Sequence, residues 1–136
     1  MQKELSSKKG SNAEKMTTQS IEKQVLDSNP LLEAFGNAKT FKNNNSSRYG
    51  KFIKVNFDLS GKIKFAQINQ YLLEKSRVVF QLQQERNFHI FYQVLSCQQF
   101  RDKYKLKRVE DYNYINQSGV STIAGVDDQQ EMQLTL

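Results

Sequence analysis

Residues 43–52 read Asn-Asn-Asn-Ser-Ser-Arg-Tyr-Gly-Lys-Phe, a polar run that leads directly into an apolar, β-branched segment. Its side-chain amides, hydroxyls and guanidinium are hydrogen-bond donors for phosphate oxygens. A serine hydroxyl is also an oxygen ligand of the kind that Mg²⁺ accepts. The run therefore suits contact with a polyphosphate, although clusters of Asn and Ser between apolar segments are usually surface turns.

The segment after this loop has the pattern of a β-hairpin. Apolar and polar residues alternate over residues 53–57, Ser60 and Gly61 provide a turn, and the alternation resumes over residues 62–65. A period of two places alternate side chains on one face of a strand, so we expect a hairpin over residues 51–66. Ile68 then breaks the period, which indicates either a β-bulge or the start of a helix.

The segment before the loop has helical periodicity from Ser20 to Gly36. Asn29 and Pro30 interrupt it, and asparagine favours the N-cap while proline favours the first helical position. We therefore expect two short helices, the second of which begins at Pro30. Gly36 would end that helix in the left-handed conformation.

A further helix is predicted over residues 84–97, where four apolar residues share one face: Phe88, Phe91, Tyr92 and Leu95. His89 has no Cys, His or paired carboxylate at metal-ligand spacing nearby, so we assign it a structural role. Cys97 is the single cysteine, which rules out an internal disulfide. We expect it to pack near the end of the helix.

The C-terminal part has weaker signals. Short extended pieces are expected at residues 112–115 and 120–123, with a turn at residues 116–119 between them. Asp128 and Glu131 have the spacing of a capping pair, which predicts the start of a last helix at Asp128.

Composition sets broad limits. The chain has 136 residues, is 38% apolar and carries a formal charge of +6, which allows one modest domain and would attract nucleic acid, anionic lipid or a nucleotide. Basic residues gather around Tyr104 and Leu106, which indicates a solvated surface or, alternatively, a contact with a phosphate backbone. The single cysteine is compatible with a reducing compartment, so we expect an intracellular protein. Neither a membrane span nor the apolar core of a signal peptide is evident.

Residues 43–52 resemble switch I of the myosin motor domain, where an Asn-x-Asn-Ser-Ser-Arg-aromatic-Gly-Lys-Phe string precedes a strand of the central sheet. Kinesin motors share the Ser-Ser-Arg element but not the aromatic-Gly-Lys-Phe continuation. Three further strings resemble the myosin family: residues 29–40, 71–78 and 85–93. The resemblance covers roughly residues 20–132 and only a fraction of a motor domain.

The resemblance implies an α/β fold, namely a fragment of the P-loop NTPase-type myosin motor domain. It would contain a β-hairpin of the central transducer sheet with flanking helices. Residues 1–20 would form a flexible basic loop like loop 1, and residues 21–136 a partial motor domain. Within that part we expect switch I at residues 43–52 and the transducer strands at about residues 51–73. We further expect one helix at about residues 84–97 and a truncated C-terminal helix from about residue 128.

The resemblance also implies roles for individual side chains. Asn43, Ser46 and Ser47 would bind the cofactor, Mg-ATP. Ser46 would line the γ-phosphate and help to place the attacking water, and the Ser47 hydroxyl would be a metal ligand for Mg²⁺. Arg48 would pair with a glutamate of switch II and so close the site. Ser46 and Arg48 are therefore the candidate catalytic residues.

The function implied is that of an actin-based, ATP-driven motor of the cytoplasmic cytoskeleton. Its partners would be ATP, the actin filament and the remainder of the myosin heavy chain. The chain contains no Gly-x-x-x-x-Gly-Lys-Ser/Thr phosphate loop, so we expect it to be inactive as an ATPase on its own. Two alternatives are a small basic nucleic-acid-binding module that uses residues 48–52 and a noncatalytic interaction protein that uses the apolar face of residues 88–95.

Overall fold

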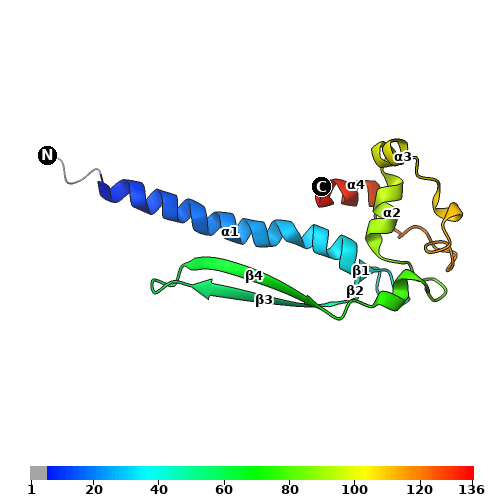
Figure 1. The fold of residues 1–136 in the computed structure, drawn as a ribbon, viewed down its shortest axis with the longest axis horizontal. Coiled ribbons are helices and arrows are strands. Elements are labelled where there is room, and N and C mark those ends of the chain that lie inside the picture. The colour runs from blue at the N-terminus through cyan, green and yellow to red at the C-terminus, as the bar shows by residue number, and fades with distance from the viewer. Residues whose placement is uncertain (1–5) are drawn as a thin grey trace. The chain divides into compact units, whose positions relative to one another are not determined.

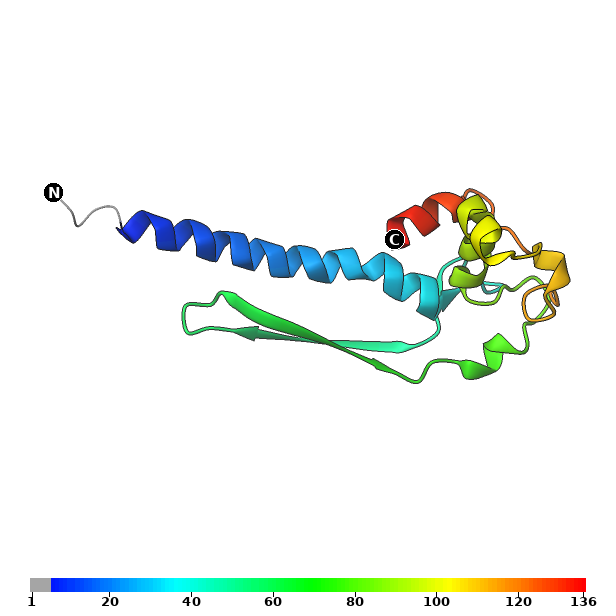
Figure 2. The ribbon, with the colours of Figure 1, turned by 45° about the horizontal axis from the view of Figure 1, so that its top comes forward.

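In the computed structural model the backbone is described for residues 6–136 and the side chains for residues 21–136. The chain divides into two compact units, whose elements are labelled in Figure 1; Figure 2 shows the same ribbon turned by 45°. The first unit combines the chain up to Asn29 with residues 51–69, and the second combines residues 30–50 with residues 70–136. The loop predicted at residues 1–20 lies outside the described side chains, and its flexibility stays a prediction.

Helix α1, Ser6–Gly36, is continuous. The predicted division into two helices at Pro30 is therefore wrong, and residues 6–20 have helical backbone. An internal proline removes one backbone hydrogen bond and costs roughly 3 kcal/mol, but the turns on either side keep their own bonds. The Asn29 side chain does not cap a helix; it accepts a hydrogen bond from Lys51 Nζ at 3.1 Å. The boundary between the two units nevertheless falls between Asn29 and Pro30.

Gly36 ends α1, but not in the predicted left-handed conformation, since it is absent from the residues with positive φ. A glycine is required there for another reason. A Cβ atom at Gly36 would lie 2.2 Å from Cε1 of Tyr49. The ring of Tyr49 therefore lies directly against the end of the helix, and only a residue without a side chain allows that approach.

The predicted hairpin is confirmed by strands β3, Gly50–Phe57, and β4, Ile63–Tyr71, which are hydrogen-bonded neighbours. The Asp58 carboxylate holds the turn, because its Oδ1 accepts from the backbone N–H groups of Ser60 at 2.8 Å and Lys62 at 3.0 Å. The strand continues beyond Ile68, so a helix does not begin there.

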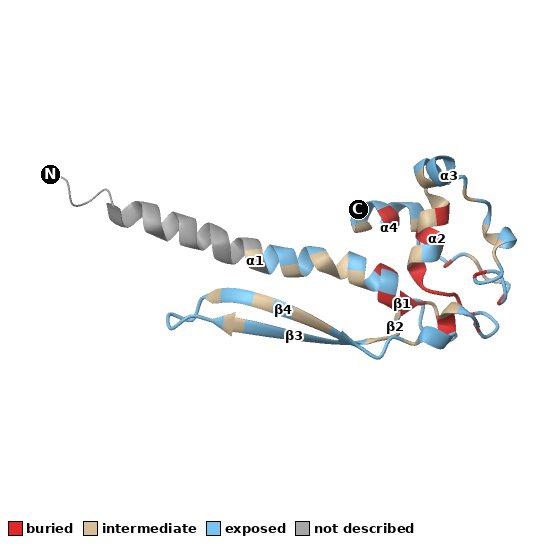
Figure 3. Cartoon of the chain, viewed as in Figure 1, coloured by how far each residue is buried: buried red, intermediate tan, exposed pale blue. Residues whose placement is uncertain are grey.

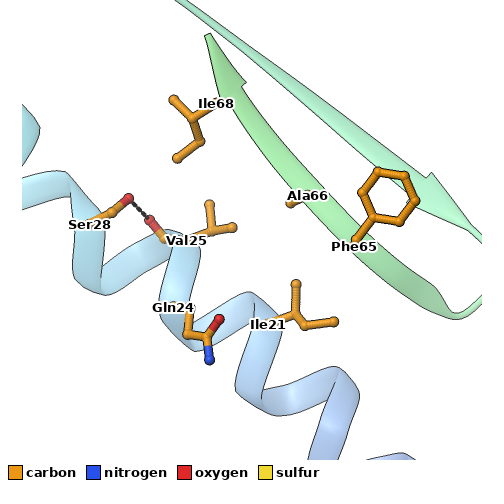
Figure 4. A pocket seen from close by; sticks show the side chains of 7 residues that line it. All are labelled: Ile21, Gln24, Val25, Ser28, Phe65, Ala66 and Ile68. Carbon is orange, nitrogen blue, oxygen red and sulfur yellow. Dashed lines mark hydrogen bonds between the residues drawn. The ribbon is translucent and has the colours of Figure 1, made fainter.

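Within the first unit α1 runs beside β4 (Figure 4). Ile21 and Val25 of the helix and Phe65 and Ile68 of the strand line a groove of about 270 Å³. The apolar residues of the hairpin are largely exposed, and Phe57 and Phe65 keep 60% and 50% of their surface. The apolar face that the alternation predicts is thus only partly covered in this chain.

The second unit contains a short antiparallel pair, β1, Asn37–Ala38, and β2, Ser46–Ser47. Its helical elements follow in order: η1, Lys75–Val78; α2, His89–Ser96; α3, Gln98–Tyr104; η2, Val109–Asp111; and α4, Asp128–Thr135. Tyr92, Leu95 and Ile115 form its buried core. Figure 3 shows this burial concentrated at β1, α2 and the segment before α2.

The helix predicted over residues 84–97 begins five residues later, at His89. Gln84 has a φ of 65°, which a right-handed helix excludes. The backbone N–H of Arg86 donates to the Lys39 carbonyl at 2.9 Å, and Phe88 forms an antiparallel bridge with Ala38. Because these backbone groups are bonded to β1 and the residue after it, residues 84–88 cannot bond to one another as a helix.

The extended pieces predicted at residues 112–115 and 120–123 are not strands, whereas the turn at residues 116–119 is present. Side chains replace the missing strand bonds. Nδ2 of Asn87 donates to the Tyr114 carbonyl at 2.8 Å, and the Tyr92 hydroxyl donates to the Ile115 carbonyl at 3.1 Å. Buried carbonyls satisfied in this way need no partner strand.

The last helix begins as predicted at Asp128, but Asp127 is its cap. Oδ1 of Asp127 accepts from the N–H of Gln129 at 2.9 Å. Asp128 instead pairs with Arg86, which has no exposed surface. Of the helices in the described part of the chain, none is long and apolar enough to cross a membrane.

These assignments predict different costs for two neighbouring substitutions. Asp128→Ala leaves the buried Arg86 cation unpaired and should lower the free energy of unfolding by about 3 kcal/mol. Asp127→Ala removes only a helix cap and should cost about 1 kcal/mol. Urea denaturation of both variants measures the difference. Equal costs would contradict the assignment of Asp128 to the ion pair.

Candidate functional site

The candidate site consists of the loop between β1 and β2, the two residues of β2 and the residues that follow it. Thr40, which is buried, closes the loop: its N–H donates to the Asn43 carbonyl at 2.8 Å, and its Oγ1 accepts from the Asn43 N–H at 3.1 Å. A hydroxyl can accept a hydrogen bond and donate one at the same time. Thr40 thereby ties the first residue of the switch-like run back to β1.

The Ser46 hydroxyl lies 3.2 Å from that of Thr40. Thr40 has one hydroxyl proton, and it donates this proton to the Asn43 carbonyl at 3.1 Å. Ser46 is therefore the donor of the bond between the two hydroxyls. The lone pairs of Ser46 Oγ remain available as acceptors, for example for the proton of a water molecule.

Ser47 is exposed, and its hydroxyl donates to the Tyr49 carbonyl at 3.0 Å. This bond uses the proton and leaves the oxygen lone pairs free, which is the state that a hydroxyl ligand of Mg²⁺ needs. Among the described residues no group of three or more His, Cys, Asp or Glu side chains could hold a metal ion. Ser47 could thus be one ligand of a cation whose other ligands come from phosphate, water or another segment.

The side chain of Asn43 is oriented by its neighbour. Its Oδ1 accepts from the N–H of Asn45 at 2.8 Å. The opposite end of the amide, Nδ2, is a donor, and the residue is exposed. Asn43 therefore presents N–H groups outward, as a contact with phosphate oxygens requires.

Arg48 is held by an acidic residue of this chain. Its Nε donates to Oε2 of Glu74 at 2.7 Å, and its carbonyl accepts from the Glu74 N–H at 3.0 Å. The hydrogen bond that Arg48 donates to Glu74 raises the pKa of Arg48 and lowers the pKa of Glu74. Both groups stay charged at neutral pH.

Glu74 is itself fixed by a second arginine. Nε of Arg77 donates to Glu74 Oε2 at 2.6 Å, and Nη1 of Arg77 donates to Oε2 of Glu85 at 2.9 Å. Arg77 is only 5% exposed. Arg48, Glu74, Arg77 and Glu85 therefore form a chain of alternating charges that anchors the end of the loop to η1 and to the segment before α2.

Sequence reasoning identified Asn43, Ser46, Ser47 and Arg48, and the structure brings all four into one short segment. Sequence reasoning did not identify Thr40, whose hydroxyl orders the loop, or Glu74 as the partner of Arg48. A threonine three residues before Asn43 is a local signal for a side-chain turn. Glu74 lies 26 positions from Arg48, and no local pattern indicates that contact.

Comparison with known proteins places the chain in a family. The family model described as Myosin head (motor domain) matches residues 4–136. The chain belongs to this family. It is 53% identical over 118 residues to the Myosin-J heavy chain of Dictyostelium discoideum, a match that covers 85% of this chain and 5% of that protein. It is 45% identical over 133 residues to Myosin-51 of Schizosaccharomyces pombe, covering 96% of this chain and 9% of that protein.

The resemblance drawn from residues 43–52 is thus confirmed at the level of the myosin head family. The observed mixture of helices with small antiparallel sheets is compatible with an α/β fragment. The chain spans about 5 to 10% of the length of myosin heavy chains that it matches.

The structural role predicted for His89 agrees with its surroundings. It is 8% exposed, and its Nε2 lies 3.1 Å from Oδ1 of Asn45. Burial lowers the pKa of His89 to about 4, and the nearby charge of Arg86 acts in the same direction. The imidazole is therefore neutral at physiological pH.

This lowered pKa predicts that acid weakens the fold. An unfolded histidine titrates near 6.5, so between about pH 6.5 and 4 the unfolded chain binds the proton and the folded chain does not. The free energy of unfolding should fall over this range by up to about 3 kcal/mol. Urea denaturation at several pH values measures it, and His89→Gln should remove this component. An NMR titration midpoint of about 6.5 for the folded histidine would contradict the prediction.

Proposed function

We propose that this chain is part of an actin-based, ATP-driven cytoskeletal motor and that residues 43–52 act as its switch I, the loop that senses nucleotide and magnesium. Membership of the myosin head family supports the motor assignment. The observation that supports the switch is the set of free groups on one loop: the Ser47 and Ser46 lone pairs and the Asn43 amide. Family membership also favours a motor over a nucleic-acid-binding module or a noncatalytic interaction protein.

In this proposal each group contributes to positioning and charge stabilisation, which phosphoryl transfer requires. Ser47 would hold Mg²⁺ through its hydroxyl oxygen, and Asn43 would donate to the phosphates. Ser46 would accept a hydrogen bond from the attacking water while it donates its own hydroxyl proton to Oγ1 of Thr40. Mg²⁺, when bound with ATP, neutralises the charge that develops on the phosphate oxygens.

Arg48 closes the site with a carboxylate from switch II of the motor. Only Nε of its guanidinium is bonded to Glu74, so the terminal nitrogens can receive a second carboxylate as a fork. Glu74 keeps the arginine in place before that partner arrives. The candidate catalytic role of Arg48 is therefore to latch the loop and not to transfer a proton.

Movement would follow from the continuity of the loop with the sheet. Gly50, three residues after Ser47, is the first residue of β3. We assign β3 and β4 to the transducer of a P-loop NTPase-type motor domain. Loss of the γ-phosphate would release the loop, and the strand attached to it would respond, as in other switches that are ordered by a phosphate.

The remainder of the myosin heavy chain is the partner that completes the site. The second unit has an apolar groove of about 810 Å³, lined by residues that include Phe35, Leu73, Phe88, Phe91 and Leu136. Exposed apolar surface of this extent marks a contact with other protein. We assign the groove to other parts of the motor domain, and we place the motor in the cytoplasm on the actin cytoskeleton.

A chimeric motor tests this function. The matching segment of the Dictyostelium Myosin-J heavy chain would be replaced by the corresponding residues of this chain. We expect the chimera to hydrolyse Mg-ATP and Ser47→Ala to lower the rate by about 100-fold, because a ligand of the Mg²⁺ that neutralises the phosphate charge is lost. Ser60→Ala, in the hairpin turn, is the control and should have no effect.

A complementary prediction concerns the 136-residue chain alone. It lacks a phosphate loop and should neither hydrolyse ATP nor bind it tightly, because one hydroxyl ligand and a few amides cannot outcompete water. Isothermal titration with Mg-ATP measures this. Micromolar binding by the isolated chain would show that it holds a complete nucleotide site.

A further inference from the structure

The side chain of Asn45 is bonded at both ends of its amide. Its Oδ1 lies 2.9 Å from Nδ2 of Asn37 and 3.1 Å from Nε2 of His89. Its Nδ2 donates to Oε2 of Glu33 at 3.0 Å. Asn45 is thus the centre of a polar network formed by α1, β1 and the first residue of α2, although it lies on an exposed loop.

The partners define the protonation state of this network. The Glu33 carboxylate only accepts hydrogen bonds, so it must face the NH₂ group of Asn45. The oxygen of Asn45 then faces His89, which must donate from Nε2. Because His89 is 8% exposed and has a pKa of about 4, it is neutral and carries its single ring proton on Nε2. The charged groups that affect this ring are Arg86, Asp128 and Glu33.

Asn45 also connects this polar network with the candidate nucleotide site. Its backbone N–H is the donor that orients Oδ1 of Asn43 at 2.8 Å, and the next residue is Ser46 in β2. The bonded side-chain amide anchors the backbone of Asn45, so a shift of that backbone would move the N–H group that orients Asn43. His89 is well placed to prevent it, since α2 is anchored in the buried core by Tyr92 and Leu95.

We propose that His89 is a positioning residue of the nucleotide loop: its Nε2–H, acting through the Asn45 amide, holds Asn43 in the orientation that donates to phosphate. This inference rests on the proposed switch function and goes beyond it by naming a residue 46 positions from Asn43. His89 touches neither the nucleotide nor the reacting atoms, so its effect must pass entirely through Asn45.

That requirement separates a positioning role from ordinary packing. In the chimeric motor, His89→Leu keeps an apolar side chain at the site but removes the donor, and we expect the KM for Mg-ATP to rise at least 10-fold. His89→Gln can place an N–H group toward Asn45, so its KM should stay within about 3-fold of the unmodified chimera, since a donor is retained. Ser96→Ala, on the same helix, is the control, because its hydroxyl bonds only within the helix to the Gln93 carbonyl.

A double-mutant cycle supplies the decisive readout. If His89 acts through Asn45, then His89→Leu should not raise the KM further once Asn45→Ala is present. Equal effects of His89→Leu in both backgrounds would overturn the proposal and leave the switch function intact. An unmodified chimera without ATPase activity would instead overturn the switch function, and the positioning role with it.

Nitrogen NMR of the 136-residue chain gives a test that needs no leucine variant. His89 is the single histidine, so its ring signals require no assignment. We expect the neutral tautomer with the proton on Nε2. A neutral ring with the proton on Nδ1, or a charged ring at neutral pH, would overturn the proposal even if His89→Leu failed to fold.

Discussion

The second unit depends on one buried cation. Arg86 has no exposed surface, and a guanidinium in such a place is tolerated only when it is paired. Its terminal nitrogens donate to the two Asp128 oxygens at 2.9 Å each, and its central carbon lies 3.8 Å from the centre of the Tyr92 ring. Arg86 lies in the segment before α2, Asp128 lies in α4 and Tyr92 lies in α2. The pairing therefore fixes the positions at which the two helices pack.

The polar side chains beside Arg86 are likewise paired with partners inside the fold. Glu85 bonds to Arg77, Asn87 bonds to the Val78 and Tyr114 carbonyls, and His89 lies against Asn45. Each of these contacts satisfies a polar group that would otherwise be buried without a partner. A segment that directs consecutive side chains to several distant elements cannot be a regular helix, so α2 starts only after it. The loop that carries Ser46 and Ser47 is positioned by the same segment.

This arrangement explains what the sequence could predict. The hairpin was predictable, because alternation and a turn residue are local signals. The chemistry expected of residues 43–48 stays a prediction. The start of α2, the cap at Asp127 and the pairing of Arg48 with Glu74 were not predictable. Each is decided by a contact between residues far apart in sequence, and local propensity yields to such contacts. The continuity of α1 through Pro30 has a local cause instead, since the intact turns on both sides outweigh one lost bond.

The loop itself divides its side chains between two tasks. Asn45 and Arg48 are bonded to α1, α2 and η1 and hold the backbone, whereas Asn43 and Ser47 use only local bonds and keep groups free for a ligand. A loop with all its polar groups satisfied internally could not respond to a phosphate. A loop with none satisfied would pay the full entropy of ordering when the phosphate arrives. The division lets a small number of new contacts favour one state of the loop over the other, which is the energetic condition for a switch.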